Sequence, residues 1–166
     1  MPAGATYTAI ASTTLTSYAT SITISSIPST YTDLILVYSG GISSGVRNGI
    51  QFNGDTGNNY TWVTGNGAGG SSSLSAEGGT SNKIQFGAFH SFNQEPLDMY
   101  VTHIANYAST STKKTVVSQG GTYIQTWWGG GYWNSTSAIN SIRLLVDGTQ
   151  TFYQGCTLTL YGVTAA

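Results

Sequence analysis

The sequence has 166 residues, only 7% of which are Asp, Glu, Lys or Arg, and its formal net charge is −1. This composition excludes a basic nucleic-acid-binding surface and a polybasic membrane-binding segment. The single cysteine excludes a disulfide within the chain, and the length fits one domain.

The surface is expected to be polar but nearly uncharged, because Ser and Thr together make up more than a quarter of the residues and 22 are Gly. A low charge weakens the repulsion that keeps copies of a protein apart. The composition therefore suits a protein that works in an assembly, and it equally suits an ordinary secreted or surface β-domain.

The N-terminus carries no targeting signal that the sequence reveals. Residues 1–5 are small and unpatterned, and we expect them to form a flexible arm in front of a domain at 6–166. This start has no positive charge and no long apolar run follows it, so we expect synthesis in the cytoplasm without standard export.

Alternating apolar and polar residues predict short strands in the first half of the chain, at 7–11, 20–27, 31–38, 50–52 and 60–64. Ile22 and Ile24 share one face of their strand, as do Tyr60 and Trp62. Leu34–Val37 is apolar throughout, which predicts a central strand covered on both sides. Residues 65–82 are nearly all small and polar, and we expect a long loop there.

Further strands are predicted at 84–92, 97–107, 115–119 and 123–127, with a loop at 108–114. In the first of these strands, Ile84, Phe86 and Ala88 are expected to face inward. The second is the longest, and its apolar face is expected to hold Leu97, Met99, Val101, His103, Ala105 and Tyr107. The glycine-rich segment Trp127–Trp133 is expected to be a loop that displays aromatic rings.

The C-terminal region is expected to hold two strands joined by a polar turn. Ile139, Ile142, Leu144 and Val146 supply the apolar set of the first, and Leu158, Leu160 and Gly162 supply that of the second. We expect the second strand to lie inside a sheet and close the fold.

About ten short strands and no helical periodicity predict an all-β protein. Many strands with long cross-connections favour a single-domain, jelly-roll-like antiparallel β-sandwich over an immunoglobulin-like domain. No internal repeat of 20–50 residues is evident, which argues against a propeller or solenoid.

No residue pattern predicts catalysis, and we expect neither enzymatic activity nor a cofactor or metal. The two histidines, His90 and His103, lack partners at metal-ligand spacing, and His103 is expected to be buried and hydrogen-bonded. The carboxylates are scattered, at Asp33, Asp55, Glu77, Glu95, Asp98 and Asp147. A converging pair, as in a glycoside hydrolase, stays open as an alternative. Cys156 is expected to be a buried structural thiol.

The aromatic cluster at 127–133 is the best candidate for a contact with a partner or ligand. Exposed Trp and Tyr side chains stack on sugar rings and anchor protein interfaces. Neighbouring residues of a strand point to opposite sides, so we expect one of Trp127 and Trp128 to be exposed. Trp127, Trp128 and Tyr132 are the predicted contact residues.

Several segments resemble a β-sandwich module that is widespread in virion proteins of tailed phages. These segments are residues 7–15 (YTAIASTTL), 27–36 (IPSTYTDLIL), 52–60 (FNGDTGNNY), Trp133 followed by 136–142 (TSAINSI), and 155–163 (GCTLTLYGV). The resemblance implies a jelly-roll-like virion component, often trimeric, found as a capsid decoration protein or at the tips of tail fibres. The module keeps a Trp at the position of Trp133, so the resemblance implies that Trp133 lies in the core. The Trp127–Gly131 segment departs from the usual pattern of the module.

The resemblance makes a capsid decoration (cement) protein the leading expectation. It would be a homotrimer on the outer capsid surface of the virion, bound to the major capsid protein, with no nucleic acid or membrane partner. The alternative is a tail-fibre or appendage tip that binds host surface glycans through the aromatic cluster. A hydrolase remains a third hypothesis.

Overall fold

The computed structural model describes residues 6–43, 47–68, 74–88, 98–122 and 125–164, and contains no helix in this part of the chain. The predicted arm at 1–5 and His90 and Glu95 lie outside the described residues. Twelve strands are present: β1 (Tyr7–Thr14), β2 (Ser21–Ile24), β3 (Asp33–Gly40), β4 (Arg47–Phe52), β5 (Tyr60–Ala68), β6 (Leu74–Ser81), β7 (Ile84–Ala88), β8 (Asp98–Ala105), β9 (Lys114–Gly121), β10 (Gln125–Trp133), β11 (Ile142–Val146) and β12 (Thr157–Val163).

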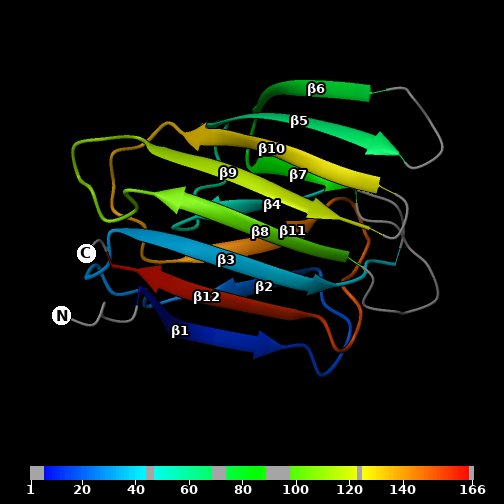
Figure 1. Ribbon diagram of the computed structural model, residues 1–166, viewed down its shortest axis with the longest axis horizontal. Helices are drawn as coiled ribbons and strands as arrows, with labels where there is room; N and C mark the ends of the chain where they lie inside the picture. Colours follow the sequence, from blue (N-terminus) through cyan, green and yellow to red (C-terminus); the bar gives the residue numbers. More distant parts are fainter. Residues whose placement is uncertain (1–5, 44–46, 69–73, 89–97, 123–124, 165–166) are drawn as a thin grey trace.

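The strands form an antiparallel sandwich of two unequal sheets (Figure 1). The large sheet has eight strands in the order β1-β12-β3-β8-β9-β10-β5-β6, and the small sheet has four in the order β2-β11-β4-β7. Every pairing is antiparallel, and the expected all-β sandwich is confirmed.

A jelly roll forms the centre of the sandwich. Its four strand pairs, β1·β12, β2·β11, β3·β8 and β4·β7, are nested in sequence and divided between the two sheets. The remaining strands are two insertions, β5–β6 and β9–β10, that pair with one another and extend the large sheet beyond β8. The insertions account for the difference in width between the sheets.

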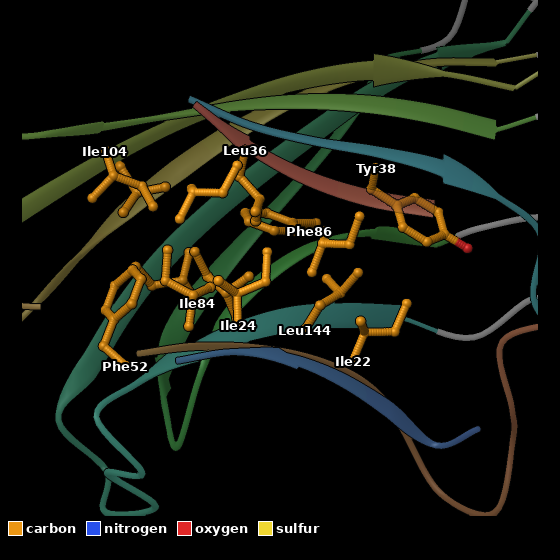
Figure 2. Packing of buried hydrophobic residues seen from close by; sticks show 14 of the residues in the cluster. Ile22, Ile24, Leu36, Tyr38, Phe52, Ile84, Phe86, Ile104 and Leu144 are labelled. Atoms are coloured by element: carbon orange, nitrogen blue, oxygen red, sulfur yellow. The ribbon is translucent and has the colours of Figure 1, made fainter. Parts of the chain in front are cut away.

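The core lies between the sheets and is built from the predicted alternating positions (Figure 2). Ile22, Ile24 and Leu144 from the small sheet face Leu36 and Ile104 from the large one, and all are buried. Ile84 and Phe86 point inward as expected, while the side chain of Ala88 lies outside the described part. Tyr60 and Trp62 are also buried, which confirms that they share one face of β5.

The C-terminal strands occupy central positions in different sheets. β12 lies between β1 and β3 in the large sheet, which confirms that it lies inside a sheet. β11 lies between β2 and β4 in the small sheet, so residues 147–156 cross from one sheet to the other. The expected strands are present, but they are not paired with each other.

Two segments that were expected to be loops are strands. The predicted loop at 65–82 contains the end of β5 and all of β6, which are paired from Tyr60↔Ser81 to Gly67↔Leu74. The predicted loop at 127–133 is β10, which is hydrogen-bonded on both sides, to β5 and β9. Both predictions are wrong because the hydrogen bonds between paired strands are made by the backbone. Residues with small side chains can therefore form a strand where the neighbouring strands have high β-propensity.

The face of β8 that was expected to be inward is the outer one. Tyr100, Thr102 and Ile104 are buried, whereas Met99 and His103 are exposed. The described part of this strand ends at Ala105, and Asn106 has a positive φ of 50°. This irregularity changes the alternation, so Tyr107 is buried although Met99 is not.

Lys114 is a buried cation at one end of the sandwich. Its Nζ donates to the carbonyl oxygens of Ser109 and Thr112 at 2.7 Å and to that of Thr136 at 3.2 Å. Burial lowers the pKa of this amine. The three bonds tie the connection between β8 and β9 to the one that follows β10.

Replacing Gly131 by Ala tests the assignment of 127–133 to a strand. A Cβ at Gly131 would lie 2.0 Å from the carbonyl oxygen of Thr61 on β5, so the alanine must force the two backbones apart. We expect the free energy of unfolding in urea to fall by about 1–3 kcal/mol.

Gly79→Ala is the matched control, because Gly79 is on the same cross-strand row, where a Cβ would meet only the Trp62 ring at 3.9 Å. This variant should be neutral or stabilising by up to about 1 kcal/mol. Equal effects of the two substitutions would contradict the tight β5–β10 pairing.

Candidate functional site

The outer faces of the two sheets differ in chemistry. On the small sheet, the outward positions hold mainly polar residues, among them Thr23, Gln51, Gln85 and Arg143. On the large sheet, six of the seven exposed large hydrophobic side chains of the described residues lie on the outer face: Tyr7, Val63, Met99, Val117, Trp128 and Tyr132. The seventh is Tyr18. This outer face is therefore the candidate site.

Strand register places these side chains in rows across the sheet. One row runs Tyr161, Ile35, His103, Val117, Gly130 and Val63. The next runs Thr159, Val37, Val101, Gln119, Trp128 and Gly65. β3 is central, as predicted, but among the described residues the expected cover on both sides is incomplete: Leu34 and Leu36 are buried, while Ile35 and Val37 are only partly buried on the outer face.

The aromatic patch consists of Val63, Trp128 and Tyr132 on β5 and β10. Trp128 lies across Gly65, where a Cβ would come within 2.7 Å of the indole ring. Glycine at this position lets the ring rest against the strand while 46% of the residue stays exposed. The Nζ of Lys113 lies 5.6 Å from the centre of the Tyr132 ring, in a cation–π contact at the end of the patch.

The other predicted aromatic residues point to the opposite side of β10. Trp127 packs against the core, and Trp133 is only 3% exposed. The expectation that one of Trp127 and Trp128 is exposed is confirmed, and it is Trp128. Trp133 in the core is also confirmed. Trp127 does not share the outer face with Trp128 and Tyr132.

A shallow hollow of about 420 Å³ lies beside the aromatic patch, over β1, β12, β3, β8 and β9. Its lining is mainly apolar, with Ile35, Val101, Val117 and Val163 among its residues, and Asp33, His103, Gln119 and Tyr7 add polar groups. A second depression of about 380 Å³ adjoins it and is lined by Met99, Val101, Gln119, Gly120, Gly121 and Thr126.

His103 and Asp33 form the polar pair of this hollow. The Nε2 of His103 lies 2.9 Å from the Oδ2 of Asp33, and the backbone N–H of Asn106 donates to the Oδ1 of Asp33 at 2.7 Å. The His103 side chain is 47% exposed, so the expectation of a buried histidine is wrong. Sequence reasoning missed Asp33 because nothing in the chain links it to a residue 70 positions away.

The described carboxylates have structural partners. Glu77 pairs with Arg47, Asp147 accepts from Lys83 at 2.5 Å, and Asp33 accepts from Asn106. The side chain of Asp98 lies outside the described part. Within the described residues, no group of three His, Cys, Asp or Glu side chains could hold a metal ion, and no helix is long and apolar enough to cross a membrane. Cys156 is buried, and its Sγ lies 3.3 Å from the Tyr38 hydroxyl.

Asp55 anchors the turn between β4 and β5 to the core. Its Oδ2 accepts from Trp133 Nε1 at 2.7 Å, and its Oδ1 accepts from the N–H of Gly57 at 2.9 Å. The amide of Asn59 donates to both oxygens. Burial raises the pKa of Asp55, but the hydrogen bonds from Trp133, Gly57 and Asn59 together outweigh it and hold the pKa below its ordinary value. Nearby, burial raises the pKa of Tyr60 to about 12.

Comparisons with known proteins show no family. No family model matches the sequence, and no curated protein matches it. The fold is similar to part of an exo-inulinase from Aspergillus awamori, with a TM-score of 0.41 and 12% identity over 95% of this chain and 29% of the inulinase. It is also similar to the galectin LEC-6 from Caenorhabditis elegans, with a TM-score of 0.39 and 10% identity over 93% of this chain and 96% of the galectin. Similarities this low carry no conclusion about function.

Replacing Asp55 by Asn should weaken the fold in a pH-dependent way. A depressed pKa means that ionised Asp55 stabilises the folded state above the pKa of the unfolded chain, near 3.8, and that this contribution is lost as the pH falls through the lower folded value. We expect the variant to lose about 1–3 kcal/mol at pH 7, as for hydrogen bonds to a charged group.

Urea unfolding from pH 7 to pH 2 measures this difference, which should shrink below about pH 4. Glu77→Gln is the control, since Glu77 and Arg47 are both exposed and such pairs contribute about 0–1 kcal/mol. A difference for Asp55→Asn that stays constant over the whole pH range would contradict the role of its charge.

Proposed function

We propose that the chain is a non-enzymatic structural component of a tailed-phage virion, and that it acts as a capsid decoration protein on the outer shell. The observation that carries the proposal is the apolar outer face of the large sheet. Combined with the low charge of the chain, this face suits a subunit that is held in place by contacts with other proteins.

Exposed apolar surface of this kind needs a partner. Soluble monomers rarely expose contiguous apolar patches larger than a few hundred Å², and larger patches mark interaction sites. The cores of protein interfaces are poor in charge and rich in Trp, Tyr and Met. Val117 is 60% exposed and lines the hollow, and Met99 is 54% exposed and lines the second depression on the same face.

Decoration would be a mechanical role, and the arrangement of the carboxylates agrees with it. Asp33, Asp55, Glu77 and Asp147 hold parts of the fold together. A shell-bound subunit needs modest contacts repeated by symmetry, because linked contacts add avidity without any chemistry.

The copy number of this chain in purified virions tests the proposal. A decoration protein should be present in about the same order of copies as the major capsid protein, and image reconstruction of the virion should place it on the outer shell. A copy number far below that of the capsid protein, or density confined to the tail, would contradict decoration.

A glycan-binding appendage tip is the second candidate, and one observation favours it. Trp128 rests one side of its indole on Gly65 and is 46% exposed, which is how an aromatic platform for a sugar ring is built. Gln119 is its register partner on β9 and could donate hydrogen bonds to a bound hydroxyl.

Glycan-array binding tests this second candidate. If sugars stack on Trp128, then Trp128→Ala should abolish binding, whereas Tyr18→Ala, which removes an exposed ring elsewhere, should leave it intact. Binding that is unchanged in the Trp128 variant, or absent in the unaltered protein, would count against the glycan role.

A further inference from the structure

We infer that a second copy of this chain covers the outer face of the large sheet, with the aromatic patch of one copy packed into the hollow of the next. The inference rests on the proposed function only in that the chain works in an assembly. It adds which surface the copies share and how they are oriented.

The two features lie on opposite halves of one face. The aromatic patch is on β10 and β5, and the hollow is lined from β1, β12, β3, β8 and β9. Figure 1 shows the order of these strands across the large sheet. A two-fold rotation about an axis in the interface, parallel to the strands, reverses the order of the strands across the face. It leaves each residue at the same position along the strand direction. Such an axis therefore brings the patch of one copy opposite the hollow of its neighbour.

The charges at one end of the face are complementary under this rotation. Tyr132, Thr115 and Ala105 are register partners, and Lys113 stacks on Tyr132 at this end. Asp33 lies at the same end, where it accepts from Asn106, and its side chain is 23% exposed. The rotation keeps the level along the strands, so the ammonium of Lys113 in one copy approaches the carboxylate of Asp33 in the next.

The face is large enough for a stable contact. At about 4.8 Å per strand and about 3.3 Å per residue, eight strands of about eight residues form a face of about 1,000 Å². A standard interface takes about 800 Å² from each partner. Among the described residues the small sheet offers no comparable surface, because its outward positions include the exposed Arg143 and Thr23 and the buried Gln51.

Analytical ultracentrifugation of the full chain tests whether the copies associate through this face. We expect a closed oligomer, and we expect Trp128→Ala in the patch and Val117→Glu in the hollow each to raise the dissociation constant by about tenfold or more. Val117 is 60% exposed, so its replacement should leave the fold intact, which circular dichroism and thermal unfolding would verify. Thr23→Glu on the outer face of the small sheet is the matched control and should leave the dissociation constant unchanged.

Mixing the two variants distinguishes a patch-to-hollow contact from any other arrangement. The Trp128→Ala protein keeps an intact hollow, and the Val117→Glu protein keeps an intact patch. A mixture can therefore form one good contact that neither protein can form alone. Association in the mixture that exceeds that of either variant alone supports the inference, and a mixture no more associated than its components overturns it.

A charge reversal tests the orientation. Lys113→Glu should weaken association and lose the salt dependence of the unaltered protein, whereas Arg143→Glu, the same change on the opposite face, should do neither. Equal effects of the two reversals would overturn the strand-parallel axis, and a monomeric unaltered protein would overturn the whole inference.

These results separate this inference from the proposed function. If the unaltered chain is monomeric in solution and is still present on virions at full copy number, the shared face is wrong while decoration stands. If the copies associate as described but the chain is absent from the capsid, decoration is wrong while the shared face stands.

Discussion

Apolar packing between two sheets of unequal width is the constraint on which the rest of this structure depends. The four strands that the jelly roll contributes to the large sheet and the four that it contributes to the small sheet cover one another. The two inserted hairpins widen the large sheet alone, and their inward residues are covered where β5 and β10 contact β7. The sandwich thus gains a broad outer surface on one side, which the residues that the structure describes do not cover.

The sequence predicted the sandwich because its core strands alternate cleanly, as at Ile22 and Ile24 or Leu158 and Leu160. It predicted the first residues of β10 as part of a strand at 123–127, but it could not predict β6 or the rest of β10, whose glycines and serines have low β-propensity and are held by backbone ladders to stronger neighbours. It also could not tell which face of β8 is inward, since Met99 and Val101 are as apolar as Tyr100 and Ile104. His103 was therefore placed in the core, although it lies beside Asp33 on the surface.

The glycines of β10 change how its aromatic residues are understood. In a loop these glycines would have made the backbone flexible. In the strand they let the backbone of β10 approach those of its neighbours closely. A Cβ at Gly130 would lie 2.3 Å from the carbonyl oxygen of Val116, so β10 can sit between its neighbours only without side chains there. Trp128 and Tyr132 are consequently fixed on a rigid sheet, separated by Gly130. Rings held in this way lose little conformational entropy when a partner binds, which favours contact residues on a strand over the same residues on a mobile loop.

The apolar stretch Leu34–Val37 connects the sequence to the proposed assembly. A strand that is apolar on both faces is typical of a position covered on both sides. Among the described residues of one chain, Leu34 and Leu36 have such cover, whereas Ile35 and Val37 face outward and are partly buried, with Ile35 in the lining of the hollow. Val101 on β8 and Val117 on β9 also face outward, so outward apolar residues occur on three neighbouring strands rather than singly. A group of outward apolar residues on β3, β8 and β9 is what a covered sheet face requires, and a second copy packed on it would supply the cover that the pattern predicts.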